Sequence, residues 1–275
     1  MLHNKIILSG LNPASYEHPF DKKALSALEA TPGLTIIGRF ITKNMVERVY
    51  TVQYTGSNLK ITKNSYPKIY EYIEYACEIL DIKTIPDLYV RWSYDINATT
   101  IGSDNPIIIL NSGLIDLCND DDEILFIIGH ECGHIKSNHM LYHMMAQVLN
   151  SIIDVIPFGS VAAAPIQYAL YYWNRMSEFT ADRAGLLCCQ NKEAAIRTFM
   201  KMAGTPINQF GHMNYETFIQ QATSFQQLDY ESLNKVIKLF SIADESHPWT
   251  VMRAAELLNW STQFPLESPH QYLID

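Results

Sequence analysis

Two kinds of apolar spacing divide the chain, one typical of strands and one typical of helices. Residues 66–80 carry apolar side chains at helical spacing, and Pro86 interrupts the pattern that follows. On both sides of this helix the chain has short runs rich in β-branched and aromatic residues, which predict strands. These predicted strands are 35–42, 47–54, 58–62, 88–92, 97–101 and 106–110. The first 64 residues are therefore expected to be β-rich.

From Ser112 onward the spacing is almost entirely helical. Acidic residues at 120–122 stand where a helix N-terminus favours them, and the apolar run 124–135 follows. A helix that is apolar on every side is a buried helix. Further helices are predicted at 166–189, 192–203, 215–222, 233–243 and 251–260. We expect a predominantly helical α+β chain, in which a β-rich segment, 1–64, packs on a main domain, 65–275.

The composition excludes several classes of protein. Hydrophobic residues make up 48% of the 275 residues and charged residues 18%, so the chain can bury a core and is not disordered. A formal net charge of −9, without a cluster of Lys or Arg, argues against binding to nucleic acid. The five cysteines include no C-x-x-C pair, which favours a reducing compartment. No signal peptide is visible at the N-terminus, so a cytoplasmic location is expected.

The buried helix predicted at 124–135 contains an H-E-x-x-H motif, from His130 through Glu131 to His134. Two histidines four residues apart lie on one helix face, one turn apart, so both imidazoles can reach a single metal ion. Glu131 projects beside them, where it can hold and deprotonate a water molecule that the ion makes more acidic. Burying two imidazoles and a carboxylate without a partner is costly, which favours a metal site over ordinary core histidines.

A site with two histidines needs a third protein ligand, whose position separates the classes of zinc protease. The metzincins continue the motif as H-x-x-G-x-x-H, but Ser137 and Met140 stand at the required positions here. The alternative is a carboxylate from a later helix. Glu178 and Asp182 lie four residues apart on one face of the helix predicted at 166–189. Glu178 can ligate the metal, and Asp182 can accept a hydrogen bond from a ligand imidazole.

The H-E-x-x-H motif followed by S-E-x-x-A-D at 177–182 resembles the M48 family of zinc metallopeptidases, to which the CAAX prenyl protease and the HtpX heat-shock protease belong. The resemblance covers roughly residues 88–257 and implies a zincin-like domain with a gluzincin-type site and one Zn²⁺ per chain. The implied roles are metal ligation by His130, His134 and Glu178, general base catalysis by Glu131, and support of a ligand imidazole by Asp182.

Two further segments are similar to parts of that family. Asn97 and Ala98 resemble its edge-strand segment, which holds the substrate peptide by backbone pairing. His247, followed by a proline and six residues later by Arg253, resembles its C-terminal His-Pro…Arg element. The resemblance implies that His247 and Arg253 line the cleft and help to stabilise the oxyanion.

The resemblance therefore implies a zinc endopeptidase that hydrolyses peptide bonds in peptides or unfolded proteins. Two alternatives stay open: a non-catalytic zinc module that binds peptides or unfolded chains, and a zinc hydrolase of a non-peptide amide. The first does not explain Glu131, because a purely structural zinc site needs no general base. The second leaves the edge-strand segment unexplained.

A second pair of histidines, His139 and His143, is also spaced for a common helix face. Nothing in the sequence supplies a third ligand for this pair, and both residues follow the motif on what we expect to be the polar side of a continuing helix. We therefore predict that they are solvated rather than ligands of a second metal.

The segment 141–173 raises the question of a membrane, because its second half carries no charge. His134 and Glu178 must bind the same ion, so any crossings between them must be even in number. The partner span would contain polar and charged residues such as Asp154, which are costly in lipid. We expect a helical hairpin that breaks at 157–159 and packs on a soluble domain, with peripheral membrane contact left open.

Overall fold

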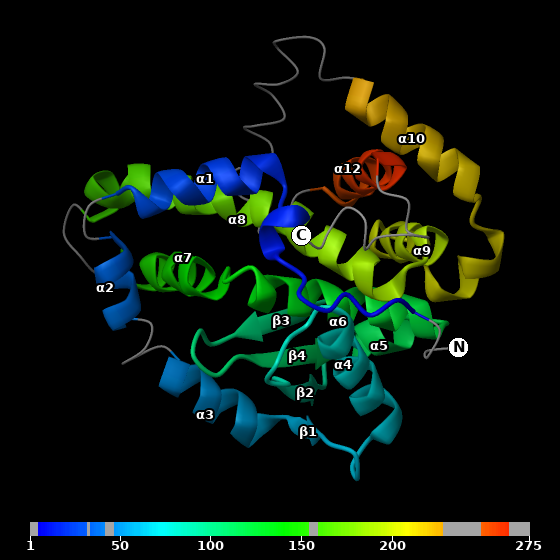
Figure 1. Ribbon diagram of the computed structural model, residues 1–275, viewed down its shortest axis with the longest axis horizontal. Coiled ribbons are helices and arrows are strands. Elements are labelled where there is room, and N and C mark those ends of the chain that lie inside the picture. The colour runs from blue at the N-terminus through cyan, green and yellow to red at the C-terminus, as the bar shows by residue number, and fades with distance from the viewer. Residues whose placement is uncertain (1–4, 32–33, 42–46, 154–158, 228–248, 264–275) are drawn as a thin grey trace.

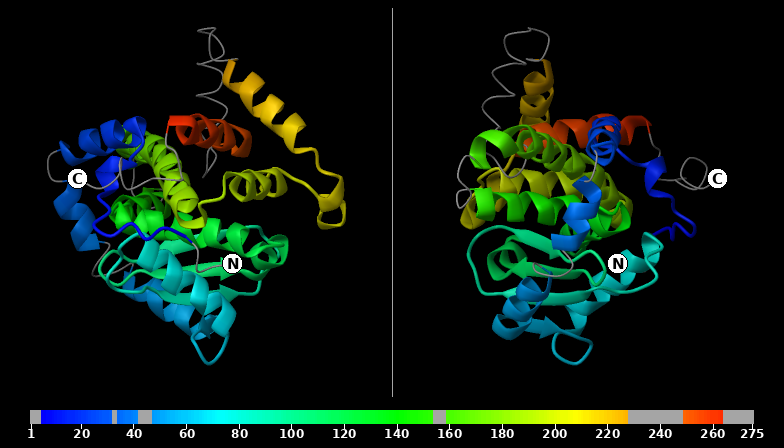
Figure 2. Two further views of the ribbon diagram at one scale, coloured as in Figure 1. Left: turned by 45° about the vertical axis from the view of Figure 1, so that its right-hand side comes forward. Right: turned by 90° about the vertical axis from the view of Figure 1, so that its left-hand side faces the viewer.

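The computed structural model describes residues 5–31, 34–41, 47–153, 159–227 and 249–263. Its elements in chain order are η2 (Pro13–Ser15), α1 (Pro19–Glu29), α2 (Leu34–Ile41), α3 (Glu47–Ser57), β1 (Leu59–Ile61), α4 (Pro67–Ile79), β2 (Asp87–Arg91), β3 (Ala98–Ile101), β4 (Ile107–Asn111), α5 (Ser112–Leu117), α6 (Asp121–Lys136), α7 (Met140–Ile153), α8 (Gly159–Cys189), α9 (Lys192–Met202), η4 (Ile207–His212), α10 (Tyr215–Gln227) and α12 (Thr250–Gln263). Figure 2 shows the sheet with α3 and α4 on one side of the molecule, and α1, α8 and α12 on the other.

Four strands of the described chain form one sheet in the order β1-β2-β4-β3. β2 and β4 run parallel, whereas β1 and β3 are antiparallel to their neighbours. Side chains of a strand alternate between the two faces of the sheet. Ile107 and Ile109 of β4 pack with Tyr50 and Tyr54 of α3, while Ile108 joins the main core with α4, α6 and α8. α3 therefore covers one face of the sheet, and α4 and α6 cover the other (Figure 1).

A mostly helical fold with a small sheet is confirmed, but the described part of residues 1–64 is not β-rich, because it contains α1, α2 and α3 and only the short strand β1. The strands predicted at 35–42 and 47–54 are wrong, because the chain forms α2 and α3 there. Tyr50 and Tyr54 stand four residues apart, so they meet the sheet from the same face of α3. Short β-branched and aromatic runs fit either a strand or an amphipathic helix, and tertiary packing decides between the two.

The helix that carries the H-E-x-x-H motif, α6, begins at a capped end, as its acidic N-terminus predicts. The Asp120 carboxylate accepts a hydrogen bond from the N–H of Glu123 at 3.0 Å, and the Glu123 carboxylate accepts one from the N–H of Asn119 at 2.7 Å. Lys201 of α9 donates to the same Glu123 carboxylate at 2.6 Å, and both side chains are buried. A buried ion pair therefore fixes the start of α6 against α9.

Glycines allow α6 and α8 to approach closely. A Cβ atom at Gly133 would lie 2.5 Å from the Cβ of Ala184, and one at Gly129 would lie 2.5 Å from the Cβ of Cys188. A larger residue at either position would push the two helices apart. The close approach brings the motif histidines of α6 within reach of the carboxylates of α8.

α7 and α8 form the predicted hairpin. Tyr142 of α7 packs against Trp173 of α8, with ring centroids 5.5 Å apart. α8 begins at Gly159, whereas residues 154–158, which include most of the predicted break, lie outside the described chain. The helix predicted at 233–243 lies outside it as well. Among the residues that were placed, none of the helices is both long and apolar enough to span a membrane.

Candidate metal centre

Three side chains from two helices meet in the interior: His130 and His134 of α6, and Glu178 of α8. The Nε2 atoms of the two imidazoles lie 3.1 Å apart. The Glu178 carboxylate lies 3.3 Å from Nε2 of His134 and 3.5 Å from Nε2 of His130. All three residues are buried, and their ligand atoms are close enough together to hold one metal ion.

The separations and hydrogen bonds of this trio fit a metal ion. Tetrahedral ligands at about 2.0–2.1 Å from an ion stand about 3.4 Å apart, which is close to the distances between these atoms. Nδ1 of His130 donates to Asp182 at 2.9 Å, so the lone pair of its Nε2 is directed into the trio. Burial lowers the pKa of His134 and outweighs the opposing effect of Glu178, which keeps this imidazole neutral. Without a cation, lone pairs of the imidazoles and the carboxylate would face one another in the interior, which is costly.

Asp182 and Arg253 lie directly behind the trio. Arg253 donates to both oxygens of Asp182, at 2.8 Å from Nε and 2.6 Å from Nη2, and its Nη1 lies 3.4 Å from Glu178. Burial alone would raise the pKa of Asp182, but the charge and hydrogen bonds of Arg253 lower it, so the carboxylate is ionised. The structure thus brings together Glu178, Asp182 and Arg253 with His130. His247 lies outside the described residues.

Glu131 lies beside the trio and lines a cavity of about 220 Å³. Asn97 and Ala98, at the start of the edge strand β3, line the same cavity. Thr100, which was not among the predicted site residues, donates its hydroxyl hydrogen to Oε2 of Glu131 at 2.6 Å. Thr100 and Ala98 are two residues apart in β3 and so share one face of the sheet. Strand alternation starting from Ala98 is the signal that points to Thr100.

The prediction that His139 and His143 are solvated is wrong. His139 is only 1% exposed and His143 is half-buried. α6 ends at Lys136, and Asn138 adopts the left-handed conformation with φ of 57°. The chain therefore turns back, and the N–H of His139 donates to the carbonyl of His134 at 3.0 Å. The prediction failed because it treated the two helices as one continuing helix.

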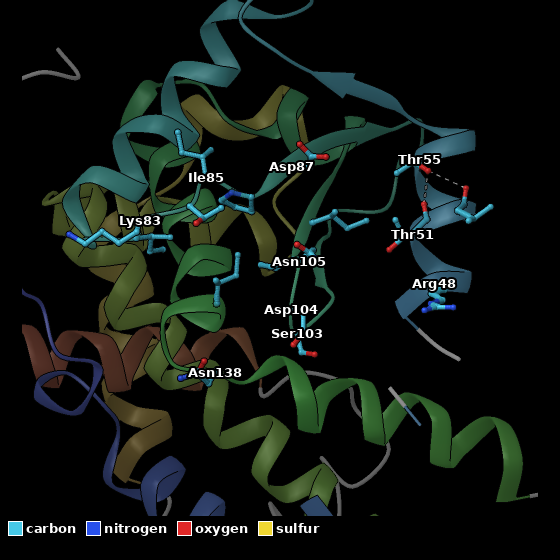
Figure 3. Close-up of a pocket in the computed structure, with 17 residues that line it drawn as sticks. Arg48, Thr51, Thr55, Lys83, Ile85, Asp87, Ser103, Asp104, Asn105 and Asn138 are labelled. Atoms are coloured by element: carbon cyan, nitrogen blue, oxygen red, sulfur yellow. Dashed lines mark hydrogen bonds between the residues drawn. The ribbon is translucent and has the colours of Figure 1, made fainter. Parts of the chain in front are cut away.

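A larger hollow, of about 1050 Å³, lies between α3 and the loops that precede β2 and β4 (Figure 3). Arg48 of α3 stands on one side of it, and Lys83 and Ile85 stand on the other. It shares no lining residue with the cavity at Glu131. This hollow is therefore separate from the candidate metal centre.

Comparisons with known proteins agree with the geometry of the site. A model of peptidase family M48 matches residues 68–261. "Plastoglobule-localized metallopeptidase 48, chloroplastic" of Arabidopsis thaliana is 31% identical over 266 residues, which cover 96% of this chain and 77% of that protein. "Uncharacterized metalloprotease YhfN" of Bacillus subtilis (strain 168) is 27% identical over 175 residues, which cover 48% of this chain and 40% of that protein. No solved structure gives a significant match.

The family match extends over well more than half of the chain and includes the helices that carry the trio and Arg253. The match to the Arabidopsis protein extends over nearly the whole chain. The chain therefore belongs to peptidase family M48 and is a metallopeptidase.

Proposed function

We propose that the protein is a zinc-dependent endopeptidase in which His130, His134 and Glu178 hold one Zn²⁺ and Glu131 is the general base. The observation that supports this most is the convergence of two imidazole nitrogens and a carboxylate, 3.1–3.5 Å apart, next to a cavity that Glu131 lines. Two nitrogen ligands and one oxygen ligand, with a fourth position open, form a donor set typical of catalytic zinc.

His130, His134 and Glu178 would hold the zinc, which would supply a Lewis acid and lower the pKa of a water molecule towards about 7. Glu131 would accept a proton from the attacking water, and the Thr100 hydroxyl, which donates to its Oε2, would hold the carboxylate in place and leave Oε1 for that proton. The water oxygen would add to the carbonyl carbon, and Glu131 would then give the proton to the nitrogen that leaves as an amine when the C–N bond breaks. Asp182 keeps the ring of His130 in the tautomer that ligation requires. A contribution of His247 and Arg253 to oxyanion stabilisation is part of the same proposal.

Peptides or unfolded proteins are the proposed substrates. β3 is one of the two edge strands of the described sheet, so an extended peptide can add to it through backbone hydrogen bonds. Asn97 and Ala98 lie at the start of that strand and line the cavity with Glu131. A peptide bound along β3 would therefore pass over the general base.

The hairpin segment 141–173 is the surface that we propose for peripheral contact with a lipid or membrane surface, in an otherwise cytoplasmic protein. Tyr168 and Tyr172 of α8 are 65% and 38% exposed, and tyrosine suits an interface that is apolar on one side and wet on the other. The Arabidopsis relative is named as plastoglobule-localised.

Metal removal tests the proposed function. Elemental analysis should find about one zinc per chain, and digestion of casein should stop with a chelator and resume when zinc is restored. Glu178→Ala should bind much less zinc, whereas Glu216→Ala, at an exposed site on α10, should keep both zinc and activity. Unchanged zinc in Glu178→Ala would remove this residue from the ligand set. A zinc-loaded protein that cleaves neither casein nor a peptide library would favour the non-catalytic binding module.

A further inference from the structure

The second ligand imidazole has a buried partner on the side away from the trio. Nδ1 of His134 lies 2.9 Å from Nδ1 of His139. Nε2 of His139 faces Oδ2 of Asp21, on α1, at 3.1 Å, although the contact is not aligned as a hydrogen bond. The Thr180 hydroxyl donates to the same oxygen of Asp21 at 2.5 Å. Contacts between buried polar groups therefore connect His134, through His139, to Asp21. Asp21 lies before residue 68, where the match to the family model begins.

The hydrogens of these groups have one consistent arrangement if His134 binds the metal through Nε2. Nδ1 of His134 then carries the hydrogen and donates it to Nδ1 of His139. Because His139 accepts there, its own hydrogen lies on Nε2, which faces Asp21. Burial raises the pKa of Asp21, but the contacts with His139 and Thr180 lower it overall, so the carboxylate is ionised and can only accept.

We infer that His139 and Asp21 are positioning residues of the metal site, which hold His134 in the tautomer and orientation that ligation through Nε2 requires. The inference rests on the proposed function, because it takes His134 as a ligand. With this inference, each of the two ligand imidazoles has a supporting carboxylate on the side away from the metal site. Asp182 contacts His130 directly, whereas Asp21 acts on His134 through a second imidazole. Groups of this kind set the basicity and orientation of a ligand histidine.

The same region offers another arrangement, because His134, His139 and His143 could together hold a second metal ion. His134 would then have to bind two ions through its two nitrogens, which requires the loss of both ring hydrogens. The distance of 2.9 Å between the Nδ1 atoms of His134 and His139 is that of a direct N–H···N hydrogen bond. Nε2 of His143 lies 2.9 Å from the Ser177 hydroxyl. These contacts favour hydrogen bonding over a second ion.

Competition for Zn²⁺ with a chromophoric chelator tests the role of His139 in the full-length protein. His139→Leu keeps an apolar side chain against Trp173 but removes the acceptor, and should weaken zinc binding by about 10–100-fold. His139→Asn places an amide oxygen close to the position of Nδ1 and should recover most of that loss. A packing role alone predicts the opposite order, because Leu fills the space against Trp173 better than Asn does. Equal binding by wild type and His139→Leu, or stronger binding by His139→Leu than by His139→Asn, would overturn the inference.

Asp21 has a matched control on its own helix. Asp21→Asn should weaken zinc binding by a smaller factor than His139→Leu, whereas Glu29→Gln, at the exposed end of α1, should leave it unchanged. The melting temperature of each metal-free variant separates a loss of fold from a loss of positioning. Glu178→Ala in the same assay tests the ligand set itself: if it binds zinc like the wild type, the proposed function fails. A second equivalent of zinc that disappears in His143→Leu would also overturn the inference.

Discussion

Replacement of Glu131 by glutamine is expected to reduce peptide cleavage by several orders of magnitude while leaving the fold and the proposed zinc in place. Glutamine has nearly the same size and can still accept the hydrogen bond from Thr100, but it cannot take a proton from water. Removal of a general base lowers a rate by about 10²–10⁴-fold. We expect a fall of this size in kcat for a peptide substrate. Zinc content should stay at the wild-type level, because Glu131 is not one of the three proposed ligands.

Two further variants sharpen this test. Glu216→Gln makes the same chemical change at an exposed site on α10 and should leave kcat unaltered. Thr100→Val keeps the base but removes the hydroxyl that holds its Oε2, so a smaller fall in kcat is expected. Cleavage by Glu131→Gln at the wild-type rate would show that another group is the base. Loss of zinc together with activity would instead show that Glu131 supports the metal.

The residues proposed as ligands are predictable from the sequence because helix geometry fixes their spacing. His130, Glu131 and His134 stand within about one turn of one helix, and Glu178 and Asp182 within about one turn of another. The sequence also predicts that both helices exist, since their apolar runs are long. What it does not predict is how closely the helices approach. That distance depends on the glycines of α6 that face α8, whose role becomes clear only once the two helices are paired.

The groups that support these ligands come from distant parts of the chain and follow no local spacing. Thr100 reaches Glu131 because the strand register directs it towards α6. His139 reaches His134 because the chain turns back after α6, and Asp21 joins them because α1 packs along α8 (Figure 1). The error at α2 and α3 has the same origin, since the packing of α3 on the sheet overrides a strand-like pattern. Tertiary contacts, rather than residue types, determine these parts of the structure.

Replacement of Arg253 by methionine is expected to destabilise the metal-free protein and to weaken zinc binding. Arg253 is 6% exposed, and its guanidinium contacts both Asp182 and Glu178. Burial alone would lower the pKa of Arg253, but the nearby carboxylates of Asp182 and Glu178 raise it above its usual value. Methionine would leave these buried carboxylates without their cation, which typically costs about 3–5 kcal/mol in the free energy of unfolding. Denaturant unfolding of the metal-free protein measures this loss.

Zinc affinity should fall in the same variant by about 10–100-fold, because Asp182 loses the group that holds it against His130. Arg253→Lys keeps the charge but cannot bond both oxygens of Asp182 in the same way, so intermediate effects are expected. Arg197→Met removes a cation that is 30% exposed on α9. Its buried partner, Glu123, keeps the ammonium of Lys201, so the loss should be only about 1 kcal/mol, with unchanged zinc affinity. If Arg253→Met costs no more than Arg197→Met, the carboxylates of the site do not depend on this guanidinium. If kcat alone falls while stability and zinc affinity hold, Arg253 acts on the oxyanion, as the family resemblance implies.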